Sequence, residues 1–138
     1  MPEKICVLLG QLNTFSTIVR LALALILGGI LGIERGRKHR PVGLRSYMIV
    51  CMASALVMLT CEYLAKEYGT GDSARLGAQV ISGIGFLGAE IIITSRQVKG
   101  LTTATGLWAA DCMGLAIGAG FYAGVGFVAL FCCLSWQP

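Results

Sequence analysis

Long apolar runs alternate with short polar stretches along this chain. A transmembrane helix needs about 20 mostly apolar residues to cross a hydrocarbon core of roughly 30 Å, and most of the runs approach that length. The pattern therefore predicts an all-α, polytopic membrane protein with about five transmembrane helices, in a single domain that covers residues 1–138. The expected spans are residues 17–33, 46–64, 76–94, 101–120 and 123–136.

The composition supports a membrane class. Hydrophobic residues make up 56% of the chain and charged residues 13%, too few polar groups to cover a small soluble domain. The 19 glycines would weaken helices in water, but in a bilayer small residues let helix backbones approach closely. Pairs four residues apart place such residues on one helix face, for packing inside one bundle or at a homodimer seam. These pairs are Gly28 with Gly32, Gly114 with Gly118, and Gly120 with Gly124.

Charged residues predict an orientation, because Lys and Arg in short loops favour the cytoplasmic side. Residues 34–45 carry five Lys/Arg against one acid, and residues 95–100 add Arg96 and Lys99. The stretch between the second and third spans, counted from Glu62 to Arg75, is net −1. The N-terminus is therefore expected outside and the C-terminus in the cytoplasm. Arg20, near the start of the first span, is expected to snorkel outward.

Asp111 is the deepest acid in the sequence. It lies about ten residues into the fourth span, or roughly 15 Å at 1.5 Å per residue. An unpaired carboxylate at that depth costs about 3 kcal/mol or more. Two interpretations stay open: a neutral acid hydrogen-bonded to Ser82 or a backbone carbonyl, and a cation or proton site. Depth counting places Gly83 and Gly85 at its level, where missing side chains leave room for an ion.

Other polar residues are assigned around Asp111. Glu90, near the end of the third span, is a second candidate metal ligand or a partner of Arg35 or Arg45. A transporter would line its path with Gln79, Ser82, Gly83 and Gly85. Glu34, Arg35 and Arg45 are expected to form a cytoplasmic charge cluster, or to anchor to lipid phosphates and fix the topology.

Catalytic and nucleic-acid-binding functions are not expected. Ser82 has no GxSG frame and no histidine within a span, only one aspartate lies deep, and no phosphate-binding loop occurs. The basic residues lie in short loops without interleaved aromatic residues, so orientation in the membrane explains them better than nucleic-acid binding does. No catalytic residue or resident cofactor is therefore expected, and the lipid bilayer is the expected environment.

Three stretches in this order resemble the MgtC/SapB family. They are LGGILGIERGRKHRPVGLRS after the first span, AQVISGIGFLGAEIII in the third, and VKGLTTATGLWAAD at the start of the fourth. Together they are far more specific than any one of them, and they cover roughly residues 21–120. Glu90 and Asp111 depart from the family pattern, which usually has small or hydroxyl residues at these positions.

The resemblance implies a multi-pass protein of the bacterial inner membrane that acts in Mg²⁺ homeostasis and, in pathogens, in virulence. It leaves two mechanisms open. One is a cation transporter or channel with Mg²⁺ as its ligand. The other is a non-transporting regulator that binds another membrane complex such as the ATP synthase. Many members carry a soluble C-terminal domain, whereas this chain ends at SWQP and is expected to have none.

Overall fold

Five helices make up the described part of the computed structural model, which covers residues 12–37, 42–93 and 100–134, without the side chains of Glu34, Arg35, Ile93 and Cys133. No strand occurs among these residues. The all-α prediction is therefore confirmed. The helices are α2 (Thr14–Arg37), α3 (Leu44–Tyr68), α4 (Ser73–Ile93), α5 (Leu101–Gly118) and α6 (Tyr122–Leu134).

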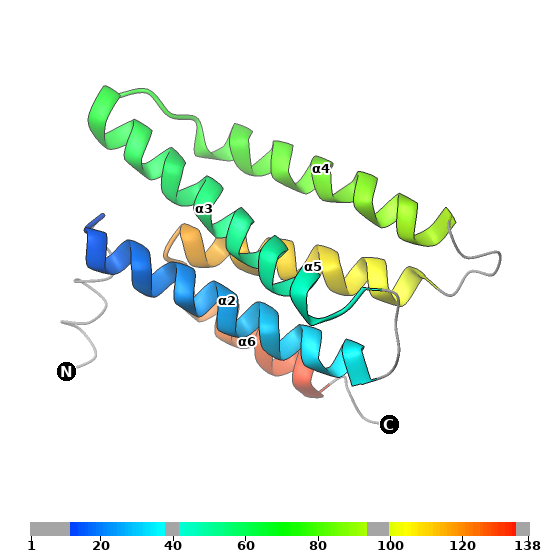
Figure 1. Ribbon diagram of the computed structural model, residues 1–138. Helices are drawn as coiled ribbons and strands as arrows, with labels where there is room; N and C mark the ends of the chain where they lie inside the picture. Colours follow the sequence, from blue (N-terminus) through cyan, green and yellow to red (C-terminus); the bar gives the residue numbers. More distant parts are fainter. Residues whose placement is uncertain (1–11, 38–41, 94–99, 135–138) are drawn as a thin grey trace.

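The helices run alternately in opposite directions, with α3 at the centre of the bundle (Figure 1). Its most extensive contacts are with α2 and α5. By contrast, α4 lies at one edge, against α5 and part of α3, and α6 lies at the other end of the bundle behind α2 (Figure 1). The buried core consequently lies along α3, including Tyr47, Cys51 and Ala55.

Polar and glycine residues decide where the helices end. Gly69 takes a left-handed conformation (φ 63°) and closes α3, its N–H donating to the Ala65 carbonyl at 3.1 Å. Asp72 caps α4 by accepting a hydrogen bond from the Arg75 N–H at 3.1 Å. These residues end α3 and begin α4. The observed α2 and α3 are longer than the predicted spans 17–33 and 46–64.

The end of α5 corrects one predicted glycine pair. Gly120 has a φ of 78°, and the Phe121 N–H donates to the Ala116 carbonyl at 2.8 Å. Together with the 3.0 Å bond from the Gly120 N–H to the Ile117 carbonyl, this forms a Schellman turn. Gly120 therefore lies outside both helices. The proposed common helix face for Gly120 and Gly124 does not exist.

The other two glycine pairs pack within the bundle. A Cβ added at Gly28 would lie 2.7 Å from the Tyr47 carbonyl oxygen, and one at Gly32 would lie 2.7 Å from Leu44 Cα. A Cβ at Gly114 of α5 would collide with the Cys51 carbonyl oxygen of α3, and one at Gly118 would lie 2.5 Å from that of Ala55. The two α2 glycines and the two α5 glycines therefore face α3, so neither pair is left for a seam between protomers.

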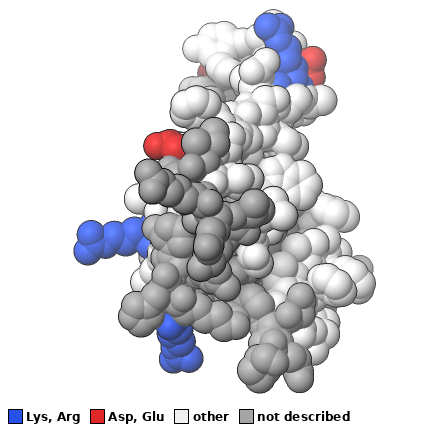
Figure 2. Space-filling view, turned by 90° about the vertical axis from the view of Figure 1, so that its right-hand side faces the viewer, with Lys and Arg blue, Asp and Glu red and all other residues white. Residues whose placement is uncertain are grey.

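The remaining surface suits a lipid environment. Large apolar side chains are exposed on every helix, among them Ile26 on α2, Leu56 on α3 and Phe127 on α6. The side of the molecule seen in Figure 2 is mostly uncharged over its described residues, with Lys, Arg, Asp and Glu in a few separate places near its edges. Residues 14–33, 44–68 and 73–92 are long and apolar enough to cross a membrane, and α6 adds a shorter apolar helix.

Candidate functional site

Asp111 is buried in the middle of the bundle, 2% exposed, against Ser54 of α3. Each residue lies ten positions after the start of its helix, counted from Leu101 and Leu44, so the two lie at the same depth in neighbouring parallel helices. The Ser54 hydroxyl contacts Asp111 Oδ1. The other carboxyl oxygen, Oδ2, is buried and has no hydrogen-bond partner.

Close approach of two backbones brings Asp111 to this position. Gly114, one turn further along α5, lies directly against the Cys51 carbonyl and the Ser54 side chain. Without a side chain at that point α5 can settle onto α3, and the short side chains of Asp111 and Ser54 then reach each other. The sequence reasoning had placed its candidate partner, Ser82, on α4, but Ser82 donates to the Ala78 carbonyl of its own helix at 2.9 Å.

The single hydroxyl hydrogen of Ser54 bears on the protonation state of Asp111. The Ser54 Oγ lies 2.9 Å from the Val50 carbonyl oxygen and also contacts Asp111 Oδ1. A serine hydroxyl has one hydrogen and cannot donate to both acceptors. If Asp111 is a neutral acid, it donates to Ser54 and Ser54 donates to Val50, so both contacts are hydrogen bonds. The arrangement therefore fits a neutral acid better than a carboxylate.

The surroundings of Asp111 do not fit a resident Mg²⁺ ion. Mg²⁺ takes an octahedral shell of oxygen ligands and usually keeps several waters, which a side chain 2% exposed cannot accommodate. The described residues contain no group of three His, Cys, Asp or Glu placed to hold a metal. Glu90, the second candidate ligand, lies on the exposed side of α4.

The predicted lining residues lie on α4 but face away from Asp111. Gln79, Ser82, Gly83 and Gly85 are all exposed, and nothing lies within 4 Å of a Cβ added at either glycine. The matching depth of Gly83 and Asp111 therefore does not create a shared gap. The expected charge cluster is only partly visible: Arg45 is exposed at the start of α3, whereas the side chains of Glu34 and Arg35 lie outside the described set.

An ion pair between buried Arg20 and half-buried Glu62 does not follow from the hydropathy pattern. Arg20 is 1% exposed and does not snorkel. Its Nη1 lies 3.0 Å from Glu62 Oε2 and donates to the Gly118 carbonyl at 2.7 Å. Carbonyls in the last turn of a helix lack partners within the helix, and a cation is favourable there. Arg20 of α2 thus joins α3 and α5 at one end of the bundle.

The observed helix bounds explain this pair. Arg20 follows the start of α2 by six residues, and Glu62 precedes the end of α3 by six residues. In adjacent antiparallel helices these positions lie at the same depth. Glu62 lies within the predicted second span, 46–64, and the structure adds that its charge is balanced by Arg20.

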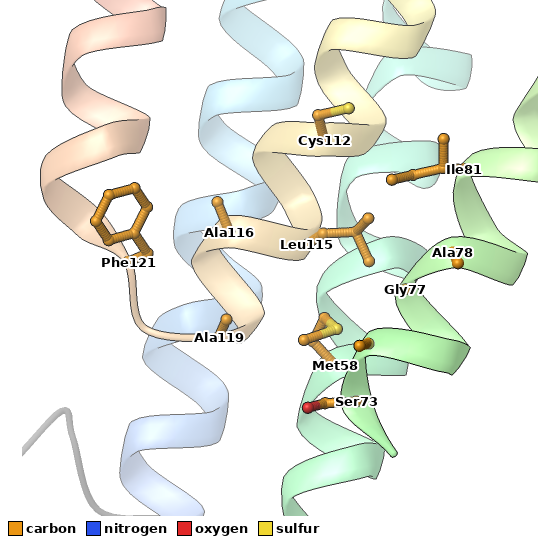
Figure 3. A pocket seen from close by; sticks show the side chains of 11 residues that line it. Met58, Ser73, Gly77, Ala78, Ile81, Cys112, Leu115, Ala116, Ala119 and Phe121 are labelled. Atoms are coloured by element: carbon orange, nitrogen blue, oxygen red, sulfur yellow. The ribbon is translucent and has the colours of Figure 1, made fainter.

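A separate hollow of about 500 Å³ lies between α3, α4 and α5 (Figure 3). Its wall is apolar, with Met58, Ile81, Leu115 and Phe121 around it and Cys112 at one side. Asp111 does not line it. The hollow therefore offers apolar contact and no set of oxygen ligands for a cation.

A substitution tests the neutral acid. We expect Asp111→Asn to keep the free energy of unfolding within about 1 kcal/mol of wild type, because an amide has the same shape and still hydrogen-bonds to Ser54. Ser54→Ala should cost about 1–3 kcal/mol, since it leaves the Asp111 side chain buried without that partner. Denaturant titration in mild detergent measures both. A larger loss in Asp111→Asn than in Ser54→Ala would show that the charge itself is needed.

Comparison with known proteins adds the family. Residues 21–137 match the MgtC family. The chain is 37% identical over 115 residues to the "Putative magnesium transporter YhiD" of Escherichia coli K12, covering 79% of this chain and 54% of that protein. It is 37% identical over 112 residues to "Protein SapB" of Bacillus subtilis, covering 76% of this chain and 48% of that protein.

A third relative, "Protein MgtC" of Brucella abortus, is 41% identical over 101 residues, covering 72% of this chain and 41% of that protein. The chain thus spans about half the length of the curated relatives it matches. No solved structure matches it significantly. With the family match over most of its residues and a bundle of apolar helices, the chain belongs to the MgtC family of membrane proteins.

Proposed function

We propose that this protein acts in Mg²⁺ homeostasis in the bacterial inner membrane, and that it does so by binding another membrane protein rather than by conducting the ion itself. The magnesium role is supported by the name of the Escherichia coli relative, "Putative magnesium transporter YhiD". The regulatory mechanism is supported by the arrangement of acidic residues within the bundle.

This proposal rests on the separation of three acidic side chains from one another in the structure. Asp111 is closed between α3 and α5, Glu62 is paired with Arg20, and Glu90 lies on the exposed side of α4. A path for a hydrated divalent cation needs successive oxygen ligands along a water-filled passage. The described helices of one chain bring no two of these three acids together.

Reconstitution tests the mechanism. Purified protein in liposomes loaded with a Mg²⁺-sensitive dye should give no more Mg²⁺ entry than empty liposomes. The same gene should support growth of a deletion strain in low Mg²⁺, because the proposed role needs a partner that only the cell supplies. Asp111→Asn should grow as wild type does.

Two results would contradict the proposal. Mg²⁺ entry that depends on the protein and is lost in Asp111→Asn would assign transport to the chain. Normal growth of the deletion strain in low Mg²⁺ would remove the magnesium role itself. The ATP synthase as the partner remains a prediction, which co-purification from membranes of the growing strain can check.

A further inference from the structure

The outward face of α4 differs from the outward faces of α2 and α6. Exposed residues within the apolar part of α2 are Phe15, Ile18, Ala22, Ile26, Ile30 and Ile33, and those of α6 are equally apolar. The outward face of α4 instead carries an amide, Gln79. Polar side chains within the membrane rarely face lipid and usually meet another polar group. A protein surface is therefore a better neighbour for this face than lipid.

Helical spacing defines this face. Leu76, Gln79, Gly83, Phe86 and Glu90 are exposed and follow one another at intervals of three and four residues, the pattern of a helix–helix seam with a crossing angle near 20°. We call these five residues the α4 seam. It lies on the opposite side of α4 from the apolar hollow, whose α4 residues are Ser73, Ala74, Gly77, Ala78 and Ile81.

The α4 seam also contains a glycine with open space beside it and a protruding aromatic side chain. A Cβ added at Gly83 would meet nothing within 4 Å. By contrast, atoms of α3 occupy the space beside each glycine of the α2 and α5 pairs. One turn away, the Phe86 ring is 75% exposed. In a membrane, small residues at a seam allow close backbone approach, and a large neighbouring side chain can fill the space that the glycine leaves.

We propose that the α4 seam is where a second copy of this chain packs, α4 against α4 about a twofold axis along the membrane normal. Two copies inserted with the same orientation must be related by such an axis, so equal residues meet at equal depth. Gln79 then meets Gln79 of the second copy. An amide has both donors and acceptors, so this pair is self-complementary.

The charged residues at the start of α4 also suit a second copy of the chain. Asp72 and Arg75 lie at the start of α4, one turn apart and both exposed. The twofold axis places the two equivalent pairs side by side, with each acid close to the base of the other copy. The hydrocarbon of the lipid offers no amide partner for Gln79. The inference does not depend on the role in Mg²⁺ homeostasis.

Two glycine variants test the seam. Gly83→Leu adds a large side chain to the α4 seam without a clash inside the monomer, since the space beside Gly83 is open. Gly126→Leu on α6 is the matched control, because Gly126 is equally open. Energy transfer between labelled copies in liposomes at decreasing protein-to-lipid ratio gives the dissociation constant. Gly83→Leu should raise it about tenfold or more, and Gly126→Leu should leave it unchanged.

Cross-linking locates the contact independently. Oxidation of Gln79→Cys in membranes should give a disulfide-linked dimer. Ile26→Cys, at an exposed apolar site on α2, and wild type with its native cysteines should not. A wild type that stays monomeric in liposomes at every ratio would overturn the proposal, as would equal weakening by both leucine variants. Cross-linking of Gln79→Cys only to a different protein would assign the seam to another partner.

Discussion

Replacing Arg20 by methionine should lower the free energy of unfolding by about 1–3 kcal/mol, since the buried Gly118 carbonyl loses its donor, whereas the Glu62 side chain is 32% exposed and can still be hydrated. Methionine keeps much of the length of the side chain but none of its donors. Glu62 would lose its counter-charge and the Gly118 carbonyl its donor. Denaturant titration in mild detergent, followed by circular dichroism, measures the loss.

Two further variants separate this pair from a general effect of losing an arginine. Arg45→Met, at an exposed position, should change stability by no more than about 0.5 kcal/mol. The double variant of Arg20→Met with Glu62→Gln should recover part of the loss, because no charge is then left unpaired. A loss below about 1 kcal/mol in the single variant Arg20→Met would show that the ion pair contributes little.

Gly114→Leu should be at least as damaging, with an expected loss of about 3 kcal/mol, the upper part of the range for overpacked cores. Even a single added carbon would collide with the Cys51 backbone, so α5 would have to move away from α3. The contact between Asp111 and Ser54 would be broken at the same time.

The control for Gly114→Leu is the same change at Gly126, where the surrounding space is open. Gly126→Leu should unfold at the same denaturant concentration as wild type. The yield of folded protein in detergent and the unfolding midpoint distinguish the two variants. A Gly114→Leu protein as stable as wild type would mean that α5 does not lie against α3 as described.

The order and approximate bounds of the helices follow from the sequence, because apolar length and the charges between runs are local properties. The helix ends were less predictable. Residues 34–37 continue α2 beyond its apolar run. Charged residues can remain helical there, because their side chains are hydrated once the helix reaches the membrane–water interface. A hydropathy pattern marks the apolar part of a span and does not mark the polar turns beyond it.

The surroundings of Asp111 show what depth alone cannot provide. Asp111 lies ten positions after the start of α5, as the residue count predicts, but position along a helix does not specify direction around its axis. The contact with Ser54 depends on Gly114 fitting the backbone of α3, and nothing in the spacing of the α5 glycines says which helix they face. Similarly, Gly83 had the right depth to lie beside Asp111 and yet points outward from α4.

The central position of α3 has a consequence for biogenesis. Its two close neighbours are separated in the chain: α2 precedes it, and α5 follows only after α4. During synthesis α2 and α3 can associate as soon as both have entered the bilayer, but the part of α3 that packs on α5 stays uncovered until α5 arrives. Ser54 consequently faces lipid or the translocation machinery while α4 is inserted. A nascent chain that stalls before Leu101 presents this bare flank to membrane quality-control proteases.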